Sequence, residues 1–126
     1  MTGADAPKTL DIPQLQERLR AFAAARDWEK FHTPKNLAMA LVAEGGELLE
    51  VLQWLTDEEA MALDEKDRAR VSEELADVQI YLVRLADVMD VSIPQAIEAK
   101  LAANAEKYPV DLSKGNATKY SRRGEE

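Results

Sequence analysis

Apolar residues recur along this chain at intervals of three and four, which is the spacing of one face of an α-helix. Such runs occupy residues 11–26, 34–55, 66–90 and 93–108, and each predicts a helix. We find no run that alternates apolar and polar residues as a half-buried strand would. The pattern therefore predicts an all-α fold.

The boundaries of these runs carry residues that favour helix starts and stops. Asp11, Thr33 and Ser92 each stand one or two positions before a proline, so each can cap a helix whose first turn contains that proline. Thr56 and the acids after it predict a short helix or a turn. Tyr108 precedes a proline and ends the last long helix, because a residue before proline is disfavoured in the α region.

Two predicted helices carry long apolar stripes. The stripe of 34–55 consists of Leu37, Leu41, Glu44, Leu48, Val51 and Leu55. That of 66–90 consists of Val71, Leu75, Val78, Leu82, Leu85 and Met89. Helix 66–90 also has apolar residues on another side, namely Ala76, Ile80, Val83 and Ala86. One small monomer would struggle to cover both sides, so we expect a four-helix bundle assembled as a homo-oligomer, with helix 66–90 near its centre.

A chain of 126 residues is one domain in size. We expect a flexible N-terminus over 1–10, a helical domain over 11–108 and an extended tail over 109–126, which is rich in Pro, Gly, Ser, Lys and Arg.

The charge balance excludes several classes of function. Asp and Glu outnumber Lys and Arg by 24 to 16, and the net charge of −8 disfavours a broad surface for nucleic acid or anionic lipid. The absence of cysteine excludes disulfides and thiolate chemistry, and a single histidine excludes His-rich metal sites. Residues 1–9 lack the apolar core of a signal peptide, and the longest apolar run, 37–43, is too short to cross a bilayer. We therefore expect a cytoplasmic protein.

Two pairs of acids lie on or beside apolar stripes, where the packing of a helical bundle does not require them. Glu44 lies on an apolar stripe with Glu47 one turn later, and Glu74 and Asp77 repeat this spacing at the flank of the other stripe. If the two helices pack together, the four carboxylates converge, and a hard divalent cation such as Mg²⁺ or Mn²⁺ would relieve their repulsion. The pattern alone leaves a solvated acidic face as the alternative.

Gly45 and Gly46 lie inside the same predicted helix, where each costs roughly 1 kcal/mol relative to alanine. They are either a tolerated weak spot or a place where another backbone, a metal or a phosphate comes close.

The sequence Glu44-Gly-Gly-Glu47, followed by Glu74-Leu-Ala-Asp77, resembles the Glu-x-x-Glu … Glu-x-x-Asp pattern of the all-α MazG-type nucleoside triphosphate pyrophosphohydrolases. Further stretches resemble their dCTP pyrophosphatase branch, namely 26–32, 34–36, 53–54, 73–82 and 107–109. The resemblance implies hydrolysis of a (deoxy)nucleoside triphosphate to the monophosphate and pyrophosphate. It also implies a Mg²⁺ site between two helices, with Mn²⁺ as a possible substitute, in a homotetramer. From the charge balance we expect neither nucleic acid nor membrane as a partner.

The same resemblance assigns roles to individual residues. Glu44, Glu47, Glu74 and Asp77 would be the metal ligands, and Glu47 is our choice for the catalytic base. The nucleoside pocket would contain Trp28, His32, Asn36, Trp54 and Tyr81. The phosphates would meet Lys100, Asn104, Lys107 and Tyr108. Without the resemblance, the aromatic residues would be read as core and the lysines as a solvated face.

We expect dCTP or a modified dCTP as substrate, and a task in cleaning the nucleotide pool. The alternatives are the same chemistry on dUTP, purine or a broad set of nucleoside triphosphates. From another class, a non-catalytic helical interaction domain would keep the fold and lose the reaction.

Overall fold

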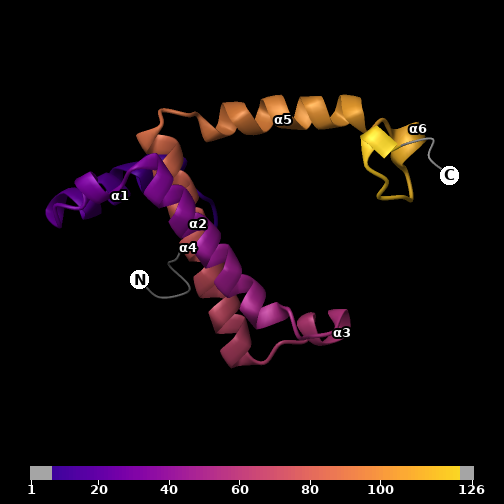
Figure 1. Cartoon of the computed structure of the whole chain (residues 1–126), viewed down its shortest axis with the longest axis horizontal. Coiled ribbons are helices and arrows are strands. Elements are labelled where there is room, and N and C mark those ends of the chain that lie inside the picture. The colour runs from indigo at the N-terminus through magenta and orange to yellow at the C-terminus, as the bar shows by residue number, and fades with distance from the viewer. Residues whose placement is uncertain (1–6, 123–126) are drawn as a thin grey trace. The chain divides into compact units, whose positions relative to one another are not determined.

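The computed structural model describes residues 7–122, with Tyr120 described by its backbone alone, and all regular structure in that range is helical. Figure 1 shows the helices α1 (Ile12–Ala25), α2 (Pro34–Leu52), α3 (Asp57–Ala60), α4 (Glu65–Val88), α5 (Ile93–Lys107) and α6 (Val110–Ser113). Two short 3-10 helices complete the set, η1 (Glu29–Phe31) and η2 (Tyr120–Arg122). The predicted all-α class is thus confirmed. A hydrophobic helix of membrane-spanning length is absent from residues 7–122.

The long helices begin where the sequence predicted. Asp11, Thr33 and Ser92 each accept a hydrogen bond from the backbone N–H three residues later, at 3.0, 3.2 and 3.3 Å. The short helix expected at Thr56 is α3, and it has a full capping box: the Thr56 hydroxyl accepts from the Glu59 N–H, and the Glu59 carboxylate accepts from the Thr56 N–H. These contacts satisfy backbone donors that a helix start leaves without partners.

The chain divides into two units, one ending at Val91 and the other beginning at Ser92. In the first unit, α2 and α4 run antiparallel and pack along each other, and α1 packs on α4 (Figure 1). The side chains buried most deeply in this unit are Ala23, Leu37, Val51, Val83 and Ala86.

Every member of the predicted stripe of 34–55 is buried or half-buried, although α2 ends at Leu52 and the last member, Leu55, lies in the turn after it. The predicted stripe of 66–90 is only partly covered within one chain: Leu75 and Leu82 of α4 and Met89 at its C-terminal cap are 54%, 39% and 54% exposed. The less exposed positions of α4 in this region instead include Glu74 and Tyr81. Helix α4 is apolar on two sides, and a single chain covers only one of them.

Helices α1 and α4 end in the same way. Asp27 and Asp90 both have positive φ, 53° and 54°, immediately after the helix. The next residue in each case donates its backbone N–H across the turn, Trp28 to the Ala23 carbonyl at 2.9 Å and Val91 to the Ala86 carbonyl at 2.8 Å. This is a Schellman motif, in which the left-handed residue lets the chain turn back over the helix end. The first of these turns fixes the position of Trp28.

The second unit contains α5, α6 and η2. The sequence pattern predicted α5 but not α6 or η2, because helices of four and three residues are too short to show a period. Gly115 has φ of 82° in the turn after α6, a conformation that favours glycine. The Asn116 side chain closes this turn by donating to the Leu112 carbonyl at 3.2 Å.

Candidate active site

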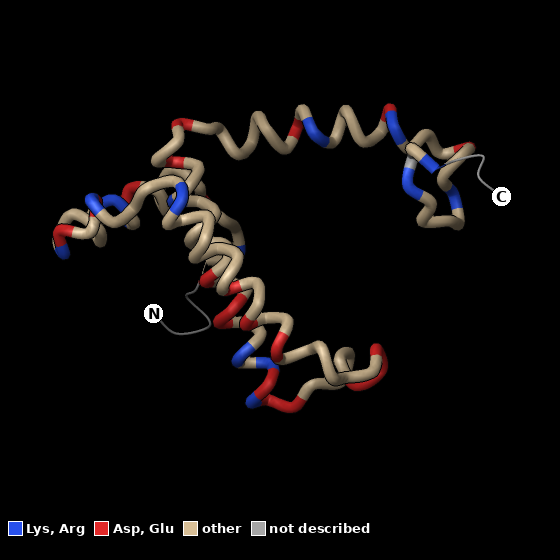
Figure 2. The backbone as a smooth tube through the Cα atoms, viewed as in Figure 1, with Lys and Arg blue, Asp and Glu red and all other residues tan. Residues whose placement is uncertain are grey.

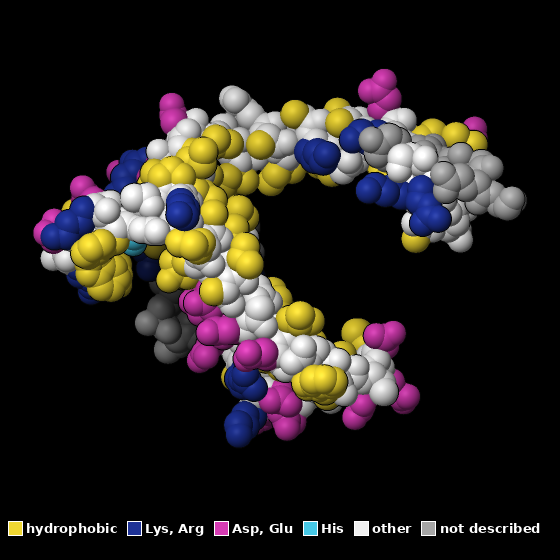
Figure 3. Space-filling view, viewed as in Figure 1, with side chains coloured by type: hydrophobic (Ala, Val, Ile, Leu, Met, Phe, Trp, Pro, Cys, Tyr) yellow, Lys and Arg dark blue, Asp and Glu magenta, His cyan; other side chains and the backbone are white. Residues whose placement is uncertain are grey.

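Carboxylates gather where α2 and α4 face each other. Figure 2 shows acidic positions concentrated on the part of this helix pair near α3, and Figure 3 shows hydrophobic side chains on the part nearer α1. Glu44 of α2 and Glu74 and Asp77 of α4 each place one carboxylate oxygen so that all three lie within 4.8 Å of one another. All three residues are half-buried. The i, i+3 spacing on α4 and the antiparallel packing bring these three acids together, whereas the sequence predicted that Glu47 would join them as a fourth.

Two atoms of this cluster lack partners. The Oε2 atoms of Glu44 and Glu74 are buried and make no hydrogen bond. Contact with the Glu74 carboxyl, followed by burial and the nearby Glu47 and Asp77, raises the pKa of Glu44 to about 7. Buried oxygen acceptors that repel one another are the donor set a hard divalent cation requires. The residues present therefore fit Mg²⁺ or Mn²⁺.

Glu47 lies at the edge of the cluster. It is exposed, and its carboxylate is close enough to Glu44 to contribute to the raised pKa of that residue. Glu47 is thus more accessible to solvent than the other three acids, and this suits a group that exchanges protons with water.

Three of the predicted nucleoside-binding residues lie around the start of α2. Trp28 is 43% exposed, and its ring makes an edge contact with that of His32, with centroids 6.5 Å apart. Trp28 also makes an edge contact with Phe22 of α1, with centroids 5.8 Å apart. The Asn36 side chain donates to the Phe31 carbonyl at 3.1 Å, and it therefore braces the loop that carries His32.

The other two predicted nucleoside-binding residues lie elsewhere. Tyr81 is half-buried on α4, one turn after Asp77. Trp54 follows the opposite end of α2 and is 86% exposed. Helix α2 has 19 residues and is about 28 Å long at 1.5 Å per residue. One chain therefore separates Trp54 from Trp28 and His32 by the length of this helix.

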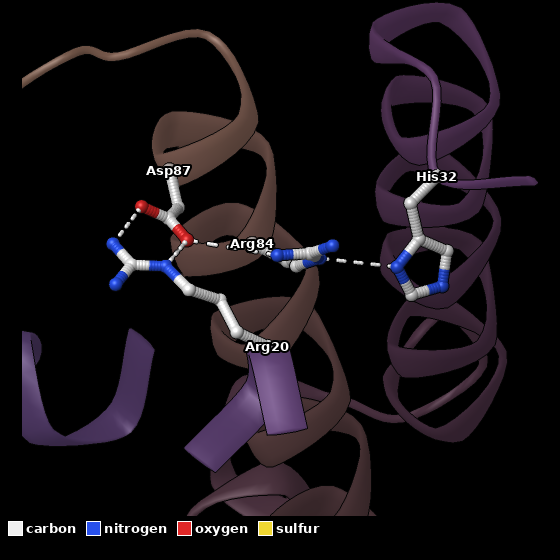
Figure 4. A network of polar contacts seen from close by, with 4 residues as sticks. All are labelled: Arg20, His32, Arg84 and Asp87. Carbon is white, nitrogen blue, oxygen red and sulfur yellow. Dashed lines mark hydrogen bonds and ion pairs between the residues drawn. The ribbon is translucent and has the colours of Figure 1, made fainter. Parts of the chain in front are cut away.

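A polar network next to His32 includes Arg20, Arg84 and Asp87, which sequence analysis did not place at the site (Figure 4). Arg20 of α1 makes two hydrogen bonds of 2.6 Å to the Asp87 carboxylate of α4. Arg84 is only 8% exposed, lies 3.6 Å from Asp87, and donates through Nε to His32 Nδ1 at 3.0 Å. The sequence held one signal for it, because Arg84 continues the spacing of Asp77 and Tyr81 along α4. Nothing in the sequence pointed to Arg20.

The predicted phosphate-binding residues all belong to the second unit. Lys100, Asn104 and Lys107 lie on α5, and Tyr108 is its C-terminal cap. The Tyr108 backbone N–H donates to the Asn104 carbonyl at 2.8 Å, so these two residues share the last turn.

Comparison with known proteins decides the family. The model of the MazG-like family matches residues 40–122, which is more than half of the chain. The chain belongs to the MazG-like family. The matched range of this MazG-like chain includes the four acids and the α5 residues, whereas Trp28, His32 and Asn36 precede it.

Individual relatives of the MazG-like chain support the same membership. It is 52% identical over 114 residues to dCTP pyrophosphatase 1 of Mus musculus, covering 86% of this chain and 67% of the relative. It is 46% identical to dCTP pyrophosphatase 1 of Homo sapiens over the same length and shares of both chains. A crystal structure of a pyrophosphatase from Archaeoglobus fulgidus DSM 4304 matches with a TM-score of 0.75 and 39% identity, covering 82% of this chain and 97% of that one.

Proposed function

We propose that this MazG-like chain is a nucleoside triphosphate pyrophosphohydrolase that cleaves its substrate to the monophosphate and pyrophosphate. The observation that carries the proposal is the carboxylate cluster between α2 and α4, with its two buried oxygens lacking partners. Relatives named as dCTP pyrophosphatases and a solved pyrophosphatase of the same fold support it.

Glu44, Glu74 and Asp77 would hold Mg²⁺, with Glu47 as a further ligand and Mn²⁺ as a substitute. When bound, the cation supplies charge neutralisation for the phosphate oxygens and lowers the pKa of the attacking water. Glu47 would accept the proton of that water, because its carboxylate lies at the solvent edge of the cluster. The half-buried position of the other three carboxylates keeps them oriented toward one site.

We assign dCTP, or a modified dCTP, as the substrate. Support comes from the dCTP pyrophosphatase relatives and from the aromatic group at the start of α2, where Trp28 and His32 can stack on a base or bind its edge. Tyr81 would extend this wall toward the acids, since it lies between Asp77 and Arg84 on α4. The task would be removal of unwanted nucleotides from the cytoplasmic pool. Activity on dUTP, purine or a broad set of triphosphates would keep the chemistry and change only these contacts.

The phosphate groups would meet Lys100, Asn104, Lys107 and Tyr108. These residues offer ammonium, amide and phenol donors from the middle of α5 to its C-terminal cap, which is the chemistry that binds phosphate oxygens.

The working enzyme would be a homo-oligomer, and we propose a tetramer. Leu75, Leu82 and Met89 leave one side of α4 apolar and exposed, and such a surface favours burial against another copy. Trp54 supports the same assembly, because a second copy could bring it to a nucleoside pocket that its own chain does not reach.

The test is release of pyrophosphate from a panel of canonical and modified (deoxy)nucleoside triphosphates with Mg²⁺, with Glu47→Gln as the control. Cytosine-selective release that disappears in the control would support both the reaction and the substrate. Release without cytosine preference would overturn the substrate alone. A folded, Mg²⁺-loaded protein that releases nothing would overturn the reaction and favour a non-catalytic interaction domain.

A further inference from the structure

Arg84 is the most deeply buried charged side chain within residues 7–122, and its guanidinium contacts the chain's single histidine. The Arg84 Nε donates to His32 Nδ1 at 3.0 Å, and Nη1 lies 3.6 Å from the Asp87 carboxylate. Asp87 is in turn held by the two hydrogen bonds from Arg20. The guanidinium of Arg84 is thus oriented from one side and directed at the imidazole on the other (Figure 4).

This contact determines where the proton of His32 lies. A guanidinium offers five N–H donors and no acceptor, so the atom it contacts must supply a lone pair. His32 Nδ1 is therefore unprotonated, and the single proton of the neutral ring is on Nε2. Burial and the charge of Arg84 both lower the pKa of His32, which agrees with a neutral ring. In Figure 4 the Nε2 side of the ring points away from Arg84.

We propose that Arg84 is a positioning residue for base selection, which holds His32 as a hydrogen-bond donor through Nε2–H. This inference rests on the proposed function, in which His32 contacts the base. A donor held in this way matches N3 of cytosine, which is an acceptor, and opposes N3 of uracil, which carries a hydrogen. A histidine free to exchange its tautomer could serve either base.

The tautomer can be measured without substrate. Because the chain has one histidine, the imidazole ¹⁵N signals of uniformly labelled protein require no assignment. We expect Nε2 to show the chemical shift of a protonated ring nitrogen and Nδ1 to show that of an unprotonated one. In Arg84→Met the donor is lost, and both nitrogens should move to intermediate shifts that indicate exchange between tautomers.

Arg84→Lys is the matched variant. Lysine and methionine are both unbranched and both lose the planar fork, but the lysine ammonium is a donor with no acceptor. Arg84→Lys should therefore keep the Nε2–H tautomer. Arg18→Met supplies a second control, because it removes an exposed arginine of α1 that lies outside the network.

Selectivity is the second readout, measured as kcat/KM for dCTP over that for dUTP. An unpaired or opposed donor at a base edge costs enough to change this ratio about fivefold or more, so Arg84→Met should lower it by that factor. Arg84→Lys and Arg18→Met should keep the ratio of the unmodified chain. Circular dichroism establishes that each variant is folded.

A proton on Nδ1 in the unmodified chain would overturn the proposal, as would Arg84→Met and Arg84→Lys variants that lose selectivity equally. Failure of the proposed function can be distinguished from failure of this proposal. A chain that hydrolyses neither nucleotide would overturn the function, while the ¹⁵N signals would still report the tautomer of His32. An Nε2–H tautomer that Arg84→Met abolishes without change in the dCTP to dUTP ratio would restrict Arg84 to a structural role and overturn base selection.

Discussion

Glu44 occupies a place on the packing stripe of α2 that an aliphatic side chain would otherwise fill. Its carboxyl is consequently half-buried next to Glu74, and the raised pKa of Glu44, about 7, follows from that neighbour and from burial. Clustered acids of this kind reduce the stability of the metal-free fold, and the fold keeps them where a cation can bind.

Glu44→Gln should stabilise the metal-free protein at pH 8 and weaken its response to Mg²⁺. A group with a raised pKa stabilises the fold below its ordinary pKa of 4.5, and this contribution is lost as the pH rises through about 7. Glutamine is neutral throughout, so thermal unfolding without metal should show a gain on the order of 1 kcal/mol at pH 8 after solvent screening, and little gain at pH 4.

Glu50→Gln is the control for this experiment, because Glu50 is an exposed acid on the same helix. Mg²⁺ should raise the melting temperature of the unmodified chain and of Glu50→Gln, but not that of Glu44→Gln. An equal response of all three proteins to Mg²⁺ would contradict the assignment of Glu44 as a ligand.

Asp87→Asn should destabilise the first unit by roughly 2–3 kcal/mol, because it leaves the buried Arg84 without a counter-charge. The hydrogen bonds from Arg20 hold the pKa of Asp87 below its ordinary 3.8. Its contribution is therefore present above pH 4 and lost as the pH falls through the lowered value. Urea unfolding at several pH values measures this.

Asp27→Asn is the matched control, since Asp27 pairs with Lys30 at the surface, where both side chains are mostly exposed. Its effect should stay within about 0.5 kcal/mol. A similar loss in both variants would mean that burial of Arg84 contributes little.

At the scale of residues, some side-chain contacts could be predicted from the sequence and others could not. The meeting of Glu44 with Glu74 and Asp77 follows from spacing on two helices, once those helices pack together. The contact between Arg84 and His32 depends on where α4 places position 84 against the loop before α2. No period in the sequence encodes that register.

At the scale of elements, α2 contains two adjacent glycines with open space next to their Cα atoms. A Cβ added to Gly45 or Gly46 would meet nothing within 4 Å in this chain. The structure of one chain therefore supplies no close approach that requires them, and their helix penalty remains.

Gly46→Ala should stabilise the protein by about 1 kcal/mol, because alanine restricts the unfolded chain and no neighbour opposes its methyl group. Urea unfolding of the variant gives the value. A loss of stability instead would indicate that a second copy lies against this part of α2 in the assembly.

Helix α4 shows that a helix can be predicted correctly while part of its predicted apolar stripe stays exposed in one chain. Both of its sides are apolar, so the period establishes a helix without saying which side meets α2. The structure places Glu74 and Tyr81 on the less exposed side and leaves Leu75 and Leu82 outside. Hydrophobicity alone would have placed Leu75 and Leu82 on the packed side and Glu74 outside. The structure differs because the side that packs on α2 carries residues of the candidate site.

At the scale of the whole molecule, the exposed side of α4 should decide assembly. Leu82→Glu introduces a charge into this surface, and burial of an unpaired charge opposes association. Light scattering after size-exclusion chromatography should report a lower mass for this variant. Met61→Glu, at a side chain that is 89% exposed outside α4, should leave the mass unchanged. Equal masses for all proteins would contradict a role for this surface.

The pairing of α2 with α4 also bears on the order in which parts of the site become available during synthesis. The two helices are joined by residues 53–64, which include α3, and both belong to the first unit of the chain. During synthesis the chain up to Val88 leaves the ribosome before α5 does, and domains fold as units from the N-terminal side. All residues of the acidic cluster therefore leave the ribosome before the proposed phosphate-binding lysines of α5, so the order of synthesis would let the divalent-cation site form before the proposed phosphate contacts.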